Sequence, residues 1–191
     1  MLSIYFKFAK IKLLIFGIII CSSVYVSAGQ RLKTGDDFPK FFLKDIKGNN
    51  FFLNDYIGDK ASRKVKCILF SFYASYCKPC LKEVPEVEKL YEKYKSNGFE
   101  IYLINEGENA ELAGKFVKEI GSDLPVLLDR YLLLNNLIGN PGVPHIVLID
   151  NKGKVRFISS GFGEEKSAEL LKTLEKEIIE ILGIKSDSSV K

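Results

Sequence analysis

The stretch SFYASYCKPC, residues 71–80, decides the fold and the chemistry expected of this chain. It completes an apolar, aromatic-rich run that begins at Cys67 and is typical of a buried strand. After a break at residues 74–76, a Cys-x-x-Cys motif opens a strongly amphipathic segment, so both cysteines should lie on the first turn of a helix. Two thiols at that spacing are close enough to form a disulfide without rearrangement of the backbone.

The position of Cys77 favours a reactive thiolate. Free N–H groups and the helix dipole at the start of a helix stabilise negative charge, which lowers the pKa of a thiol there below about 8.5. Lys78 adds a positive charge beside the sulfur, and Pro79 falls where its missing N–H costs nothing. The motif therefore predicts a reversible, reactive dithiol formed by Cys77 and Cys80.

Composition is ordinary for one globular domain, with 191 residues of which 47% are hydrophobic and 27% charged. The formal charge of +4 falls to +1 if the three lysines of the N-terminal segment are removed, so nothing suggests a nucleic-acid partner. The four cysteines do not form a structural disulfide framework, because Cys21 lies in the leader and Cys67 in the apolar strand. We expect Cys67 to be buried and inert.

Residues 1–28 have the three parts of a secretory signal: a basic region, an apolar run and small residues. Val26-Ser27-Ala28 before Gly29 fits a cleavage site. The alternative is an uncleaved membrane anchor over residues 7–28, although the apolar run from residue 13 to 28 is short for a span of about 20 residues. Either outcome predicts an exported protein, periplasmic or otherwise extracytoplasmic.

The rest of the chain alternates between strand and helix patterns. Expected strands are 41–43 and 51–53 (a hairpin), 65–73, 99–104, 125–128, 144–150 and 155–159, and expected helices are 79–96, 109–120, 131–138 and 164–182. Strands separated by helices favour parallel pairing at the centre, so the order predicts an α/β fold with a mixed sheet between helices. We expect the domain to occupy residues 29–185 and residues 186–191 to be a disordered tail.

These motifs together resemble the thioredoxin-like superfamily, and within it the exported thiol–disulfide oxidoreductases of the TlpA/ResA type. The resemblance covers about residues 34–182 and rests on residues 72–80, on Pro85, on Gly142-Val143-Pro144 and on the turn at 151–153. It implies a three-layer sandwich in which a mixed central sheet is flanked by helices, with an extra N-terminal β-hairpin. It also implies disulfide exchange with other proteins and requires no cofactor or metal.

The resemblance assigns roles to individual residues. Cys77 matches the attacking, solvent-facing cysteine, and Cys80 matches the more buried resolving cysteine. Pro144 matches the family's cis-proline, which leaves the backbone groups of Val143 free to pair with a substrate chain. Tyr76 stands where thioredoxin has tryptophan and keeps a flat apolar surface for the substrate.

One departure concerns the acid–base group. Thioredoxin has a buried aspartate six residues before the first cysteine, and this chain has Ser71 there, which is a poor base. Glu83 matches a glutamate that some ResA-type proteins place near the cysteines, so it is a candidate to relay the proton of Cys80. The alternative is a solvated charge on the helix surface.

Two functions follow for the site. The first is a thiol–disulfide oxidoreductase, acting as a monomeric reductant of exported proteins such as cytochrome c precursors and recharged by a membrane redox partner. The second is a non-catalytic copper or other metal carrier in which His145, the only histidine, joins Cys77 and Cys80; His145 could instead be a polar residue at a strand start. Half of a zinc site is disfavoured because the chain has no second Cys/His pair. A peroxidase is disfavoured because Ala74 stands where such enzymes have a hydroxyl residue.

Overall fold

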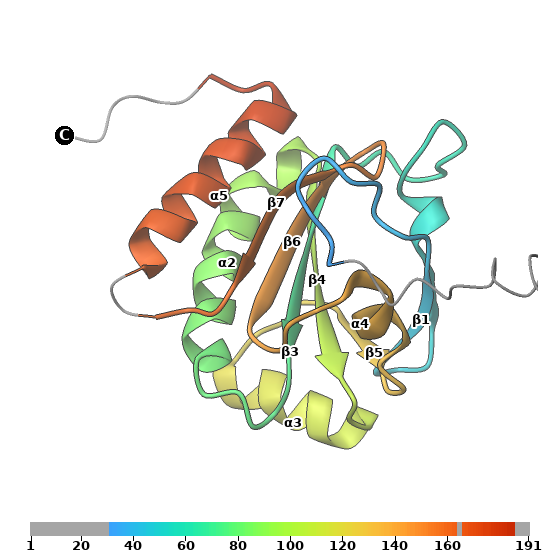
Figure 1. Ribbon diagram of the computed structural model, residues 1–191, viewed down its shortest axis with the longest axis vertical. Helices are drawn as coiled ribbons and strands as arrows, with labels where there is room; N and C mark the ends of the chain where they lie inside the picture. The colour runs from blue at the N-terminus through green and yellow to red at the C-terminus, as the bar shows by residue number, and fades with distance from the viewer. Residues whose placement is uncertain (1–30, 164–165, 186–191) are drawn as a thin grey trace, which may run out of the picture. The chain divides into compact units, whose positions relative to one another are not determined.

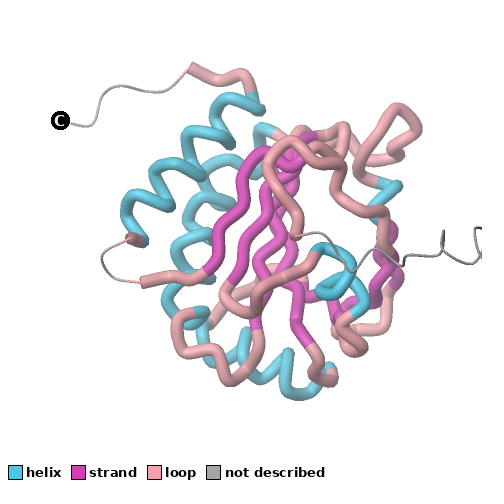
Figure 2. The backbone as a smooth tube through the Cα atoms, in the orientation of Figure 1, coloured by secondary structure: helices cyan, strands magenta, loops and turns pink. Residues whose placement is uncertain are grey.

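The computed structural model describes residues 31–163 and 166–185, which form a mixed seven-stranded sheet with helices on both faces (Figures 1 and 2). The strands are β1 (Phe42–Asp45), β2 (Asn50–Phe52), β3 (Cys67–Tyr73), β4 (Phe99–Glu106), β5 (Val126–Asp129), β6 (His145–Asp150) and β7 (Val155–Ser160). The helices are α2 (Cys80–Tyr94), α3 (Ala110–Ile120), α4 (Leu133–Ile138) and α5 (Ser167–Leu182), with 3-10 turns at Leu53–Asp55 and Lys95–Asn97.

The strand order is β2-β1-β5-β4-β3-β6-β7, with β3, β4 and β5 parallel and the outer strands antiparallel to their neighbours. The N-terminal hairpin β1–β2 extends the sheet beyond β5. The predicted fold class and its extra hairpin are therefore confirmed.

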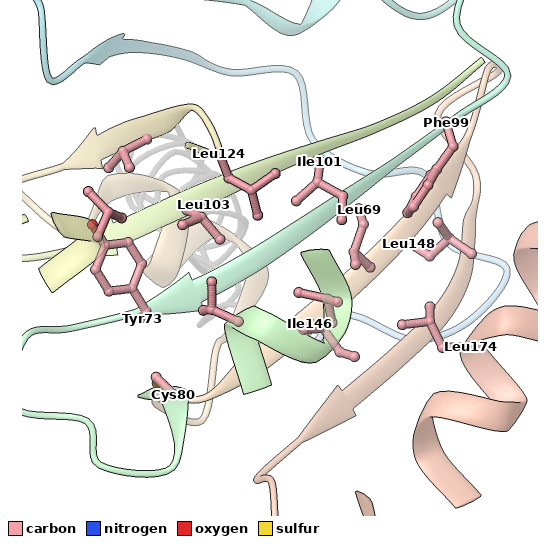
Figure 3. Close-up of a cluster of buried hydrophobic side chains, with 14 of the residues drawn as sticks. Leu69, Tyr73, Cys80, Phe99, Ile101, Leu103, Leu124, Ile146, Leu148 and Leu174 are labelled. Carbon is pink, nitrogen blue, oxygen red and sulfur yellow. The ribbon is translucent and has the colours of Figure 1, made fainter. Parts of the chain in front are cut away.

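Strand β3 is the centre of the sheet, and all seven of its residues are buried. Alternate side chains of a strand point to opposite faces. Leu69 and Tyr73 therefore enter a core with α2, α3 and α5, whereas Phe70 and Phe72 enter a second core with α4 and residues 38–57. A strand covered on both faces needs an unbroken apolar run, which is why β3 was recognisable in the sequence. Figure 3 shows part of the first core, with Tyr73 at the end of β3 and Cys80 at the start of α2.

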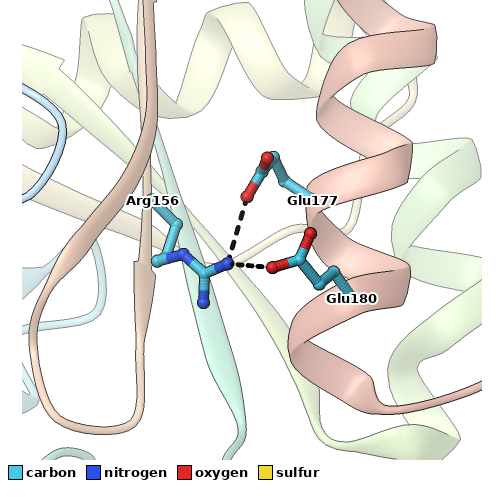
Figure 4. A network of polar contacts seen from close by, with 3 residues as sticks. All are labelled: Arg156, Glu177 and Glu180. Carbon is cyan, nitrogen blue, oxygen red and sulfur yellow. Dashed lines mark hydrogen bonds and ion pairs between the residues drawn. The ribbon is translucent and has the colours of Figure 1, made fainter.

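Polar contacts attach α5 to the sheet. On β7, Arg156 Nη2 contacts Glu180 Oε1 at 2.8 Å and Glu177 Oε2 at 3.4 Å (Figure 4). Lys66 Nζ, just before β3, donates to the carbonyl of Leu182 at 2.9 Å, at the end of the helix. Since the ion pairs are partly exposed, we attribute most of the docking energy to the buried Leu174, Ile178 and Leu182.

Most element boundaries differ from the sequence predictions by one to three residues, among them those of β4, α4 and α5. β4 extends two residues further, because Asn105 and Glu106 continue to pair with β5 despite their polar side chains. α4 begins at Leu133 rather than residue 131, because the Asp129 carboxylate binds the N–H groups of Leu133 and Asn135 and fixes the start of the helix there. α5 begins at Ser167 rather than residue 164.

The predicted signal or anchor at residues 1–28 and the predicted tail at 186–191 lie outside the described residues. Within residues 31–163 and 166–185, no helix combines the length and the hydropathy needed to cross a bilayer.

Candidate active site

The turn after β3 carries the two cysteines at the carboxyl edge of the parallel strands. Cys77 and Cys80 form a disulfide with their Cα atoms 5.3 Å apart. The Cys77 N–H donates to the Ala74 carbonyl at 3.0 Å, and the Cys80 N–H donates to the Cys77 carbonyl at 3.1 Å, so the turn is built by its own backbone. The predicted pair is thus brought together, here in its oxidised form, but α2 begins at Cys80, so Cys77 lies in the turn before the helix rather than on its first turn.

The two sulfurs have different surroundings. Cys77 is only 5% exposed, less than the solvent-facing position that the resemblance implied, and Cys80 is fully buried, while the neighbouring Tyr76 is 74% exposed. The Cys80 N–H lies 3.3 Å from Cys77 Sγ, at the first residue of α2. An N–H group and a helix start directed at a sulfur stabilise its thiolate form.

Glu83 is enclosed in the protein, one helical turn after Cys80. Its side chain is buried, and Oε1 accepts a hydrogen bond from Ser71 Oγ at 3.1 Å. Burial raises the pKa of Glu83 to about 7, and the Ser71 hydrogen bond only partly opposes this rise. The alternative of a solvated helix charge is therefore wrong. Ser71 is a hydrogen-bond donor to the carboxyl group rather than a base.

The segment before β6 supplies the other side of the site. The Val143–Pro144 peptide bond is cis, as the resemblance implied. The antiparallel register pairs His145 with Phe72, which places Pro144 beside the end of β3, where the cysteine turn begins. Val143 packs against both cores.

Asn140 holds this loop in place. Its Oδ1 accepts from the Gly142 N–H at 3.0 Å, its own N–H donates to the Asn135 carbonyl at 3.0 Å, and its Nδ2 donates to Glu106. Glu106 is buried at the end of β4, and burial raises its pKa to about 7, with the nearby Asp129 charge contributing. Sequence reasoning missed Glu106, whose only signal was a charged residue directly after an apolar strand.

Sequence reasoning also missed Glu108, whose carboxylate holds the cysteine turn in place. It accepts hydrogen bonds from the Ser75 N–H at 2.9 Å, from Ser75 Oγ and from Asn105 Nδ2 at 2.7 Å. Partial burial opposes ionisation, but the hydrogen bonds from Asn105 and Ser75 outweigh it and lower the pKa of Glu108. These contacts join the cysteine turn to the β4–α3 loop.

His145 does not join the cysteines. It faces the second core beside Phe72, with the two rings 5.6 Å apart, whereas Cys77 and Cys80 belong to the first core. His145 Nδ1 lies 2.8 Å from Ser160 Oγ, and burial lowers the pKa of His145 to about 4. Within the described part of the chain, no group of three His, Cys, Asp or Glu residues is arranged to hold a metal ion. The predicted metal-carrier arrangement of Cys77, Cys80 and His145 is therefore not formed.

A hollow of about 260 Å³ opens beside the residues between the cysteines. Lys78 and Pro79 form one wall, and Phe162 and Gly163 form the other, ahead of α5. A neighbouring hollow continues between α2 and α5 along Leu81, Pro85 and Leu171. A polypeptide bound to Cys77 would have an apolar surface on this side.

Comparison with known proteins agrees with this geometry. The sequence model of the AhpC/TSA family matches residues 34–158. Thiol-disulfide oxidoreductase ResA of Geobacillus thermodenitrificans is 35% identical over 127 residues, which are 66% of this chain and 69% of that protein. ResA of Bacillus cereus is 32% identical over 152 residues, which are 80% of this chain and 83% of that protein.

Two solved structures have the same fold. The thioredoxin domain of a thiol-disulfide oxidoreductase from Bacteroides vulgatus has a TM-score of 0.62 and 31% identity, covering 76% of this chain and 97% of that domain. A thiol:disulfide interchange protein from a Bacteroides species has a TM-score of 0.63 and 28% identity, covering 83% of this chain and 95% of that protein. The chain therefore belongs to the AhpC/TSA family and, within it, to the thioredoxin-like thiol–disulfide oxidoreductases.

Proposed function

We propose that this chain works outside the cytoplasm as a reductant of disulfides in exported proteins, with cytochrome c precursors as the substrate class. The observation that carries the proposal is the unequal cysteine pair: Cys77 keeps 5% of its surface exposed beside the exposed Tyr76, whereas Cys80 is fully buried one turn before Glu83. Export is supported by the secretory pattern of residues 1–28, which ends in a cleaved signal or remains as an anchor over residues 7–28.

The first step forms a mixed disulfide. In the reduced protein, the Cys77 thiolate attacks one sulfur of the partner's disulfide. A bond forms between Cys77 and that sulfur, the partner's S–S bond breaks, and the partner's other sulfur leaves as a thiolate. The Cys80 N–H and the start of α2 favour the attacking thiolate.

The second step resolves the mixed disulfide. The Glu83 carboxylate takes the proton of the Cys80 thiol. Its pKa of about 7 suits this role, because such a group both accepts and releases a proton at neutral pH. The Cys80 thiolate attacks Cys77 Sγ, the mixed disulfide breaks, and the second partner sulfur leaves as a thiolate. Both partner thiolates then take up protons. Two electrons have passed to the partner, and the protein holds the Cys77–Cys80 disulfide.

Tyr76, Val143 and Pro144 bind the substrate chain in this proposal. Tyr76 offers an exposed aromatic ring beside Cys77, and the backbone of Val143 pairs with an extended segment of the partner. The protein acts as a monomer, and a dithiol partner in the membrane returns it to the reduced form.

Trapping tests this proposal. The full chain with Cys80→Ser, reduced and mixed with an oxidised Cys-x-x-Cys-His peptide of the c-type haem-attachment kind, should accumulate a mixed disulfide at Cys77 that mass spectrometry detects. The matched variant Cys77→Ser should trap none. The oxidoreductase proposal fails if neither variant forms an adduct while the wild-type dithiol leaves the peptide oxidised.

A further inference from the structure

Four large apolar side chains are displayed on α4 and the turn before it. Tyr131 is 76% exposed, Leu132 37%, Leu133 69% and Leu137 56%; we name these four residues the α4 surface. Residues 131–138 contain no charged side chain. A short helix on the outside of a domain ordinarily turns polar residues to water, so an apolar outer face indicates an interaction site.

The α4 surface is held rigidly. The inner side of the helix is anchored by Leu134 and Ile138, which are both buried in the second core. The buried Asp129 carboxylate accepts the N–H groups of Leu133 and Asn135, each at 2.8 Å. A rigid surface binds a partner without an additional ordering cost.

The backbone of Leu132 is unusual. Its φ of +56° is the one positive φ at a non-glycine residue in the described part of the chain, and for a bulky side chain this conformation costs roughly 1 kcal/mol or more. The Leu132 N–H donates to the Asp129 carbonyl at 3.0 Å, which holds the conformation. Strain of this kind is typical of functional surfaces.

The α4 surface is continuous with the disulfide site through two loops. On one side, Leu132 Cδ2 lies 3.6 Å from the position that a Cβ on Gly107 would occupy, and the next residue, Glu108, binds Ser75 in the cysteine turn. On the other side, α4 runs directly into residues 139–144, which end in the cis Val143–Pro144 bond.

Exposed apolar residues elsewhere gather at the same edge. Of the nine exposed large apolar side chains in the described residues, the four of the α4 surface are joined by Tyr76, Leu81 and Leu112. These three lie on the cysteine turn and on the first turns of α2 and α3, which begin at the carboxyl ends of β3 and β4. The cysteine turn and these exposed apolar residues therefore all follow the carboxyl ends of the neighbouring strands β3, β4 and β5, which connects the α4 surface with the binding of the protein substrate.

We propose that the α4 surface binds an apolar segment of the protein substrate that flanks the disulfide being reduced. This inference rests on the proposed function, because a mixed disulfide at Cys77 places the substrate chain at this edge. The apolar residues that flank a cysteine are accessible in an unfolded chain and hidden in a folded one. The α4 surface therefore selects unfolded, disulfide-bonded chains, and it does so by burial rather than by charge.

Two synthetic peptides test the inference. Both carry the same intramolecular disulfide, flanked by leucines in one and by serines in the other. The reduced full-length chain should act on the leucine peptide with a kcat/KM about tenfold higher, mainly through a lower KM. Leu133→Asp with Leu137→Asp should abolish this preference, and Leu133→Met, which keeps an apolar side chain of similar size, should retain it.

A small aromatic disulfide, 5,5′-dithiobis(2-nitrobenzoate), separates the possible failures. Equal rates of wild type and the aspartate variant with this reagent show that the fold and the dithiol are intact. If no variant reacts with it, the proposed function itself fails. If all variants react but the two peptides remain equivalent, only the α4 inference fails.

Two further results would overturn the inference in favour of another occupant. A wild-type dimer in sedimentation that the aspartate variant abolishes, without any peptide preference, assigns the α4 surface to a second copy of the chain. A loss of affinity for phosphatidylcholine vesicles in the aspartate variant, again without peptide preference, assigns it to a lipid surface.

Discussion

At the scale of single residues, the burial of Glu83 has a chemical consequence. Because desolvation raises its pKa to about 7, its carboxylate can accept a proton near neutral pH. In the wild type, the rate at which Cys80 resolves a mixed disulfide should rise with pH around a midpoint near 7. Glu83→Gln should slow resolution by about 10- to 100-fold and remove that midpoint. Stopped-flow measurement of resolution checks this expectation, with Glu86→Gln, a partly exposed glutamate of the same helix, as control.

Cys67 shows the opposite effect of burial on a thiol. It is fully buried in β3, and desolvation, with a contribution from the Asp150 charge, raises its pKa to about 12. In the reduced native protein, iodoacetamide should therefore modify Cys77 and leave Cys67 untouched until urea unfolds the chain. Peptide mass spectrometry resolves the two sites. Modification of Cys67 at the rate of Cys77 under native conditions would contradict the assigned burial.

At the scale of elements, the start of α4 depends on one carboxylate. Asp129→Ala removes the acceptor for two N–H groups and leaves them without that partner, so the free energy of unfolding should fall by about 1–3 kcal/mol. Asp129→Asn keeps one carbonyl oxygen as an acceptor and should lose less. Urea unfolding of both variants measures the difference, and equal stability of wild type and Asp129→Ala would show that the cap contributes nothing.

Elements with local signals were predictable and contacts between elements were not. The β3 run, the cysteine turn and the amphipathic α2 are encoded in adjacent residues, so their identity followed from the sequence. The link from Glu108 to Ser75 crosses 33 residues of chain and depends on which strands pair. The burial of Glu83 could not be read from the helix pattern, because it depends on Ser71 facing it from β3.

His145 illustrates the same limit. A residue next to the cis-proline could face either side of the sheet, and only the pairing of β6 with β3 decides. Shifting a strand by one residue moves each of its side chains to the opposite face. The register directs His145 to Phe72 and Ser160, away from the sulfurs, which a single sequence cannot reveal.

At the scale of the whole molecule, three buried groups shape the dependence of stability on pH. Burial raises the pKa of Glu83 and Glu106 to about 7, so the native state holds their protons more tightly than the unfolded state between about pH 4.5 and 7. Their contribution to the free energy of unfolding is therefore present at low pH and is lost as pH rises through 7. His145, with a pKa lowered to about 4, acts in the opposite direction between about pH 6.5 and 4.

The two carboxyl groups together change the free energy of unfolding with pH more than the single His145 imidazole does. The oxidised wild type should therefore be more stable at pH 5 than at pH 8. The double variant Glu83→Gln with Glu106→Gln should lose this decline and instead gain stability from pH 5 to 6.5, as His145 alone then predicts. Urea unfolding at pH 5, 6.5 and 8 measures both profiles. A wild type that grows steadily more stable up to pH 8 would contradict the burial assigned to the two carboxyl groups.

Glu106, which accepts a hydrogen bond from Asn140, is a second buried carboxyl group of raised pKa, on the opposite face of the sheet from Glu83. Glu83 stands next to the sulfurs, whereas Glu106 reaches the loop that presents Val143. Under the proposed mechanism, acidification would act on the step at Cys80 through Glu83 and on the Val143 loop through Glu106, so that mutation can alter either response without the other.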